Sequence, residues 1–263
     1  MQALPLLGFI LNMKHLFSTC LYFFWLTWVL TASGTSKADE ILMAFSLDIP
    51  PYIFEQYNKG IEIDIIAAAL SHKGHTLRPL YFPLGRIPIA FQNNLVDAAM
   101  SDVGTDLMSY GGFYAEPAVV YDNVFITLKK RNLVINSPAD LDNLTIISFQ
   151  GAEKRYPQWL SKPFEEKRFY GISDQLTQVK LLNLERYDVV LSDRYIFKYF
   201  AKQLKYEDNI QVSRVDEHQF AEIEPQDYRP VFKSEKIRDD FNFGLKKLKE
   251  SGKFQAIYDH YIE

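Results

Sequence analysis

Cysteine is almost absent from this sequence, because Cys20 is the only thiol among its 263 residues. A single cysteine can form no disulfide within the chain. Cys20 lies inside an apolar run and is followed by Leu21 and Tyr22, whereas a lipid-attachment cysteine is expected to end such a run. The segment around Cys20 is also predicted to be removed. We therefore expect the rest of the chain to contain no disulfide, no cysteine nucleophile and no cysteine-ligated metal.

Acidic residues are missing from residues 1–38. Within this segment a short basic start, Lys14 and His15, precedes an apolar run at 16–31 and a small polar stretch that ends at Ala38. This order is typical of a secretory signal peptide. It predicts cleavage after Ala38 and a periplasmic location for the remaining chain.

The beginning and the nature of this segment each have an alternative. Residues 1–12 are apolar but lack the expected basic start, which favours Met13 as the true initiator. A membrane anchor is the competing interpretation of the run at 16–31. The run is shorter than the about 20 residues that a spanning helix needs, so we favour the signal peptide at 1–38.

Basic residues are in the minority after this removal. The loss of Lys14 and Lys37 leaves 27 basic against 33 acidic residues, a net charge of about −6. A negative chain argues against nucleic acid as a partner. Its length and its 48% apolar residues suffice for one large domain or for two lobes of roughly 100–150 residues each.

Predicted strands and helices alternate along the first part of the chain. Apolar runs indicate strands, and apolar residues at helical spacing indicate helices. The order is strand, helix, strand, helix, strand, at residues 41–46, 60–72, 77–82, 87–94 and 96–100. This order implies a parallel sheet with helices packed against it.

A second α/β series follows without a Pro/Gly-rich linker. We expect strands at 124–128, 144–149 and 187–191, a helical turn from 138, and helices at 153–160, 194–204, 233–251 and 254–261. Two α/β units without a flexible linker indicate two lobes that are joined by crossing strands. The ligand cleft is then expected between them, at the carboxyl ends of strands.

Six segments, in this order and spacing, resemble the extracellular solute-binding proteins of family 3, the periplasmic receptors for polar amino acids that serve ABC importers. The segments are 48–54, 60–66, 87–99, 138–144, 188–193 and 237–261. They include a Gly-hydrophobic-acidic-hydrophobic-Asp helix start at Gly60 and a strand that runs from Asp188 to Asp193. The resemblance extends over nearly all of residues 39–263.

The resemblance implies an α/β, two-lobed periplasmic-binding-protein fold (type II), in which each lobe has a mainly parallel sheet with flanking helices. One lobe would comprise 39–120 plus 224–263 and the other 121–223, with crossings near 115–121 and 220–228. It also implies hinge closure around a small-molecule ligand, which a membrane permease or sensor then recognises. We expect a monomer without a cofactor or a metal.

Asp193 is the leading candidate for ligand binding. It ends an apolar strand and precedes a helix, and the matching Asp of the family pairs with the ligand's ammonium group through charge-assisted hydrogen bonds. The alternative is a helix N-cap, and both roles can coexist through different oxygens. Tyr52 matches the family's aromatic wall or is a core aromatic. Asp48 nearby is a ligand contact or caps the turn.

Backbone groups provide further candidates. Gln150 and Gly151 lie where a strand meets a helix, and exposed N–H groups there attract anions. The matching family segment contacts the ligand, and an ordinary tight turn is the alternative. Ser101 and Asp102 end the third strand of the first lobe, so we expect ligand contacts there as well.

The sequence departs from the family in one respect. In amino-acid receptors an Arg a few residues after this strand binds the ligand's α-carboxylate, whereas residues 101–113 contain no Arg or Lys. Arg86 is the nearest basic residue that could compensate, unless it is a solvated charge at a helix end. Two outcomes stay open: Arg86 replaces the missing Arg, or the ligand has no carboxylate at this place.

Three classes of function follow from these observations. We favour a binding protein for ABC-type import. A receptor for a membrane signalling protein is the alternative, because the sequence does not separate the two. A dehydratase-like enzyme on the same fold is less favoured. Such an enzyme needs a positioned acid/base pair, and His72, His75, His218 and His260 are scattered along the sequence.

Overall fold

A computed structural model describes residues 38–100, 105–206, 210–220 and 228–262. The chain divides into two units, residues 1–37 and 38–263, and all described residues belong to the second. The predicted signal peptide, apart from Ala38, lies outside the described residues. None of the described helices is both long enough and apolar enough to cross a membrane.

The first sheet is built from both ends of this unit. Its strands, in spatial order, are β2 (Thr76–Phe82), β1 (Glu40–Ser46), β3 (Ala98–Met100), β10 (Pro230–Phe232) and β4 (Phe113–Tyr114). β1 is parallel to β2 and β3, whereas β10 is antiparallel to β3 and β4. The late strand β10 thus returns the chain to the sheet with which it began.

Alternating side chains of β1 belong to two different cores. Met43 and Phe45 pack with α2 (Ile61–Ser71), α8 (Glu235–Glu250) and α9 (Lys253–Ile262). Ala44 packs on the opposite face, with α3 (Ile87–Gln92). The period-two pattern of an apolar strand therefore accounts for helices on both faces of this sheet.

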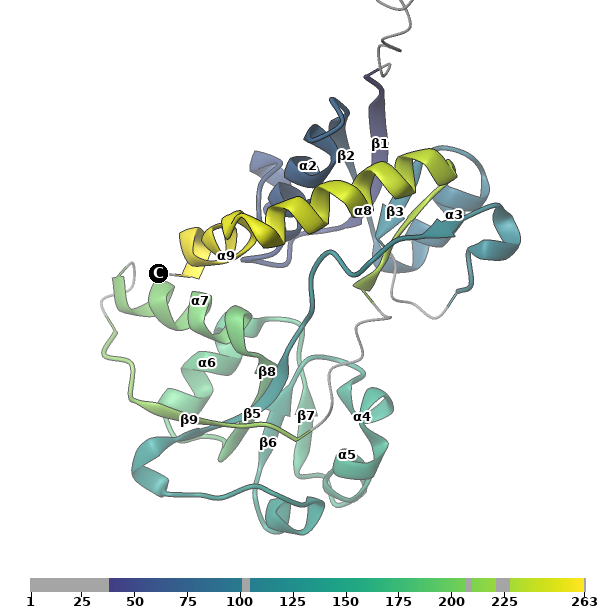
Figure 1. Cartoon of the computed structure of the whole chain (residues 1–263). Coiled ribbons are helices and arrows are strands. Elements are labelled where there is room, and N and C mark those ends of the chain that lie inside the picture. The colour runs from purple at the N-terminus through teal and green to yellow at the C-terminus, as the bar shows by residue number, and fades with distance from the viewer. Residues whose placement is uncertain (1–37, 101–104, 207–209, 221–227, 263) are drawn as a thin grey trace, which may run out of the picture. The chain divides into compact units, whose positions relative to one another are not determined.

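The two long helices α2 and α8 approach each other closely. A Cβ on Gly244 of α8 would lie 1.9 Å from the carbonyl oxygen of Ala69 in α2, so only glycine permits this distance. Figure 1 shows α8, in yellow, crossing beside α2 and the strands of the first sheet.

The second sheet has the same mixed arrangement. Its spatial order is β7 (Phe169–Gly171), β6 (Ile146–Ser148), β8 (Val189–Asp193), β5 (Asn123–Leu128) and β9 (Val215–His218). β6 is parallel to β7 and β8, whereas β5 is antiparallel to β8 and β9. One face packs on α6 (Gln175–Asn183) and α7 (Arg194–Tyr206), and the other packs with α4 (Ala152–Arg155) and α5 (Pro157–Glu165).

An aromatic cluster fills the second of these faces. The ring of Trp159 lies 5.5 Å from that of Phe125 in β5 and 5.3 Å from that of Phe220, measured between centroids. Phe220 also packs edge-on against Tyr156 at 5.0 Å. The segment after β9 is thereby fixed to the second sheet before the chain returns toward β10.

Most of the elements expected from the sequence are present, and three differences have physical causes. The helix expected at 153–160 is two helices, α4 and α5, because Pro157 begins the second one. Each sheet is mainly parallel in strand direction, as expected, but contains one strand that the sequence did not indicate as antiparallel, β10 in the first sheet and β5 in the second. Several elements were not expected at all: the short strands β4, β7, β9 and β10, and the helix α6.

Candidate functional site: an inter-sheet cavity

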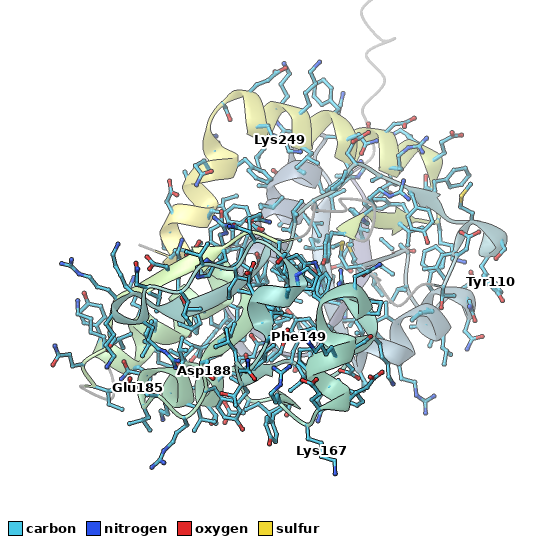
Figure 2. The ribbon with its side chains drawn as sticks, turned by 90° about the horizontal axis from the view of Figure 1, so that it is seen from below. Tyr110, Phe149, Lys167, Glu185, Asp188 and Lys249 are labelled. Carbon is cyan, nitrogen blue, oxygen red and sulfur yellow. The ribbon has the colours of Figure 1, made fainter. Side chains whose placement is uncertain are left out.

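A cavity of about 870 Å³ is lined by residues that follow strands of both sheets. From the first sheet come residues 46–49, at and just after the end of β1, and Met100, at the end of β3. From the second come residues 149–151, after β6, and Asp193, at the end of β8. These are carboxyl ends of parallel strands, where α/β folds bind ligands. Figure 2 shows one of these residues, Phe149, in the middle of the view from below, whereas Lys167 lies at its margin.

Asp193 combines a place in the cavity wall with a structural role. Its Oδ1 accepts hydrogen bonds from the backbone N–H groups of Tyr195 and Ile196, both at 2.9 Å, and so caps α7. Its Oδ2 accepts from the N–H of Asp122 at 2.6 Å and from the hydroxyl of Tyr52 at 3.2 Å. The side chain is 2% exposed. Burial raises the pKa of Asp193 to about 7, although these hydrogen bonds act in the opposite direction.

Tyr52 lies behind the cavity rather than in its wall. Its side chain is fully buried, it is not among the lining residues, and its hydroxyl also donates to the carbonyl oxygen of Val120 at 3.3 Å. Burial raises the pKa of the Tyr52 phenol well above its usual value. The structure thus places Tyr52 as a core residue that holds Asp193, and not as an exposed aromatic wall.

Gly60 positions both Tyr52 and the start of α2. It has φ 130°, and a Cβ there would lie 2.1 Å from the carbonyl oxygen of Tyr52. The same carbonyl accepts a hydrogen bond from the N–H of Glu62 at 3.1 Å. Glu62 lies in the first turn of α2, is 3% exposed and lines the cavity. The close approach at Gly60 therefore fixes the position of Glu62, whose buried side chain forms part of the cavity wall.

Three tyrosine rings in contact lead from the core to the cavity. The ring of Tyr121 lies 4.1 Å from that of Tyr52 and 5.0 Å from that of Tyr228. Tyr121 and Tyr228 both line the cavity, and each lies in one of the two predicted crossings. The hydroxyl of Tyr121 donates to Glu62 Oε2 at 3.4 Å. The two crossings are thus in direct aromatic contact beside the cavity.

The other predicted ligand-binding residues differ in whether they line the cavity. Asp48, Gln150 and Gly151 line the cavity. Asp48 Oδ1 also accepts from the N–H of Glu55 at 2.5 Å, so the turn interpretation holds alongside the cavity position. Gly151 has φ 85° and precedes α4, which spans only four residues. Ser101 and Asp102 lie outside the described residues.

Arg86 is not among the residues that line the cavity, and its side chain is exposed. The cations of the described cavity wall are instead Lys154 and Arg155, from α4. Arg155 Nη2 donates to the hydroxyl of Tyr228 at 2.5 Å, and its guanidinium lies 5.7 Å from the centroid of that ring. From the sequence, only a cation of the first lobe was expected to face the ligand. The basic pair Lys154 and Arg155, which begins three residues after Gly151, was the signal in the sequence for these cations.

No histidine is among the described residues that line the cavity. Likewise, the described residues contain no group of three or more His, Cys, Asp or Glu side chains that could hold a metal ion.

Comparison with solved structures finds the same fold at low sequence identity. AncCDT-1, an ancestral cationic amino-acid solute-binding protein and a precursor of cyclohexadienyl dehydratase, has a TM-score of 0.65 and 17% identity over 85% of this chain and 96% of its own. An amino-acid ABC transporter substrate-binding protein from Streptococcus pneumoniae, bound to L-arginine, gives 0.58 and 15% over 85% and 93%. The GluR0 ligand-binding core in complex with L-glutamate gives 0.58 and 14% over 88% and 100%.

These likenesses confirm the two-lobed α/β fold of the periplasmic-binding-protein type. No family-level sequence profile matches the chain.

Proposed function

We propose that residues 39–263 form a periplasmic solute-binding protein, which captures a small polar or amino-acid-like ligand and presents it to an ABC-type importer. The cavity carries this proposal. It has about 870 Å³, within the range of about 300–1,000 Å³ that is usual for ligand sites, and it is lined by ionisable side chains of both signs. Amino-acid-binding proteins of low identity share the fold.

Two lobes and a hinge form part of this proposal. We assign residues 39–120 plus 224–263 to the first lobe and 121–223 to the second. The membership of the two sheets supports this division, since β10 joins the early strands and β5 to β9 form their own sheet. Tyr121 and Tyr228 lie where the chain crosses, so closure around a ligand would turn about these two tyrosines.

The proposal includes secretion, a monomeric state and a membrane permease as partner. The signal-like segment at 1–38 supports export. A sensor in place of the permease is the remaining alternative, because a ligand-bound receptor core shares the fold. Uptake of the identified ligand by cells with and without the gene separates the two, since loss of uptake supports import.

We further propose that the protein binds its ligand without converting it. The carboxylate of Asp193 is engaged by four hydrogen-bond donors, which leaves it poorly placed for acid/base chemistry on a ligand. Since one neighbour is a precursor of a dehydratase, the check is direct. NMR spectra of a bound compound should stay unchanged on prolonged incubation with the protein.

The proposed function is tested by a thermal-shift screen of residues 39–263 against small metabolites. A ligand at 100 times its Kd should raise the free energy of unfolding by about 2.7 kcal/mol. Stabilisation by one compound or one narrow class supports the proposal. If no compound of a broad metabolite collection stabilises the protein, the proposal is wrong.

A further inference from the structure

A buried histidine contacts the first residue of the expected mature chain. His75 immediately precedes β2, and its side chain is fully buried. The backbone N–H of Asp39 donates to His75 Nδ1 at 3.3 Å, and His75 Nε2 lies 3.0 Å from Oδ2 of Asp240 in α8. Asp39 is also the residue that signal cleavage after Ala38 would place at the N-terminus.

The two contacts of His75 fix how its ring is protonated. A backbone N–H can only donate, so Nδ1 accepts and the ring proton lies on Nε2, which donates to Asp240. The ring is therefore neutral, and its Nδ1 presents a lone pair to the nitrogen of Asp39.

The backbone of Asp39 is held at this place from its carbonyl side as well. Its carbonyl oxygen accepts a hydrogen bond from the N–H of Thr76 at 3.0 Å, and the pairing of β1 with β2 begins at the next residue, with Glu40 opposite Thr76. These contacts come from residues 75 and 76 and use nothing that precedes Asp39. Removal of residues 1–38 therefore leaves them available.

Cleavage changes the charge of the Asp39 nitrogen. The amide of an intact chain is neutral, whereas a free α-amino group has a pKa of about 7.7–8.0 and is mostly protonated at pH 7. The carboxylate of Asp39 lies 3.8 Å from His75 Nδ1, Asp240 contacts the other ring nitrogen, and Lys236 contacts Asp240 at 2.6 Å. Two carboxylates and one ammonium leave these side chains with an excess of one negative charge, which a new ammonium neutralises.

We propose that removal of the signal segment creates an N-terminal ammonium at Asp39 that His75 binds, so that processing itself stabilises the exported protein. This rests on the export and cleavage that belong to the proposed function, but on no ligand. A neutral hydrogen bond becomes a charge-assisted one, which is roughly twice as strong. The ammonium thereby fastens β1 at the end opposite to residues 46–49, which line the cavity.

The test compares two forms of residues 39–263 that differ only in this charge. One has a free α-amino group at Asp39, and in the other this group is acetylated, which restores a neutral amide N–H. Residues 38–263 form a compact unit of their own, so both forms can be studied without the preceding segment. In urea denaturation at pH 7 the free form should have an unfolding equilibrium constant about 3- to 10-fold smaller than the acetylated form.

The advantage of the free form should depend on pH. Binding to His75 raises the pKa of the amine above its unfolded value of about 8, so the stabilisation is present below that pH and is lost as the pH rises through the folded pKa. The two forms should become equally stable toward about pH 10. Lys236, Asp240 and the Asp39 side chain are the same in both forms, so their own titration cancels in the comparison.

His75→Phe should remove the advantage of the free form, because phenylalanine keeps a buried ring but has no acceptor. His72→Phe is the matched control, since His72 is exposed and lies three residues earlier, and it should leave the advantage intact. If His75→Phe does not fold, the wild type still decides. Its α-amine should react with an amine-selective reagent more slowly in the folded protein than in urea, and equal rates would contradict the contact.

Equal stability of the free and acetylated forms at pH 7 would overturn the proposal, and so would an advantage that persists in His75→Phe. An exported protein whose N-terminus is not Asp39 would do the same. None of these results concerns the cavity, so the capture of a solute is decided by the metabolite screen alone. A failed screen would in turn leave the contact between Asp39 and His75 unaffected.

Discussion

The side chain of Asp193 accepts two hydrogen bonds on each oxygen, and its donors come from both lobes. In the proposed division, two backbone N–H groups of α7 and that of Asp122 belong to the second lobe, whereas the Tyr52 hydroxyl belongs to the first. The carboxylate therefore links the lobes through the protein itself. Its substitution should affect folding before it affects ligand binding.

Asp193→Asn is expected to lower the stability of the unligated protein. An amide has one acceptor oxygen, and its NH₂ group would face an N–H or O–H donor, so about 1–3 kcal/mol of the free energy of unfolding should be lost. Urea denaturation measures this. Asp174→Asn is the control, because Asp174 caps α6 through the N–H of Thr177 from a more exposed position and Asn caps equally well. Unchanged stability with abolished binding would contradict this role.

Stability should also depend on pH through Asp193. Burial raises its folded pKa to about 7, against about 3.9 for an unfolded Asp. Between these values the folded protein keeps a proton that the unfolded chain releases. The contribution of Asp193 to the free energy of unfolding is therefore greatest below about pH 4 and is lost as the pH rises to about 7.

The measurement is denaturant unfolding of the wild type and Asp193→Asn from pH 4 to pH 8. The free energy of unfolding of the wild type should fall relative to that of Asp193→Asn as the pH rises across this interval. A constant difference would mean that the folded carboxylate is ionised throughout.

The sequence indicated some of the cavity residues but not their partners. Asp193 could be found because a polar residue that ends a buried strand is a local signal. Glu62 looked like an ordinary charge in the first turn of a helix, although it is buried and accepts a hydrogen bond from the distant Tyr121. Arg155 gained its place through contact with Tyr228, 73 residues later in the chain. Such long-range pairs leave no periodic pattern in the sequence.

At the scale of elements, Gly60 joins the turn after β1 to the start of α2. We expect Gly60→Ala to destabilise the protein by about 2–4 kcal/mol. The new Cβ meets the Tyr52 carbonyl, and φ 130° is unfavourable for alanine. The midpoint of urea denaturation measures the change.

Gly85→Ala is the matched control for this prediction. Gly85 lies in the short 3-10 helix Leu84–Arg86, at a position where a Cβ meets nothing within 4 Å. Its substitution should leave the midpoint nearly unchanged or raise it slightly. Equal effects of the two substitutions would show that the close approach at Gly60 is unimportant.

Elements with strong periodicity or long apolar runs were predictable, and short ones were not. α2 and α8 agree with expectation to within about two residues at each end, the usual uncertainty of helix boundaries. β10 has three residues, Pro230–Phe232, and is a strand only because β3 and β4 lie on either side of it. The antiparallel strand of the first sheet therefore depends on tertiary pairing.

At the scale of the whole molecule, the order of α/β units indicated two lobes, and the two sheets agree with that order. The first sheet draws strands from residues 40–114 and 230–232, which no single stretch of sequence contains. The resemblance to solute-binding proteins supplied this discontinuity. Periodicity alone would have divided the chain into two consecutive halves.

The exported protein is expected to begin at Asp39. The small residue at position 38 follows the apolar run, as signal cleavage requires. Intact-mass measurement or N-terminal sequencing of the exported protein checks this. A membrane-retained form that still carries residues 16–31 would contradict it, and a start before Met13 would appear only in the uncleaved precursor.

The aromatic cluster of the second lobe has a spectroscopic consequence. Two of the three tryptophans, Trp25 and Trp28, lie in the segment that we expect to be removed, which leaves Trp159 as the sole indole. Its emission reports the environment between Phe125 and Phe220 alone. Fluorescence therefore follows the second lobe, whereas circular dichroism follows both. Superimposable denaturation curves from the two probes would show that the lobes unfold as one cooperative unit, and separated curves would give each lobe its own stability.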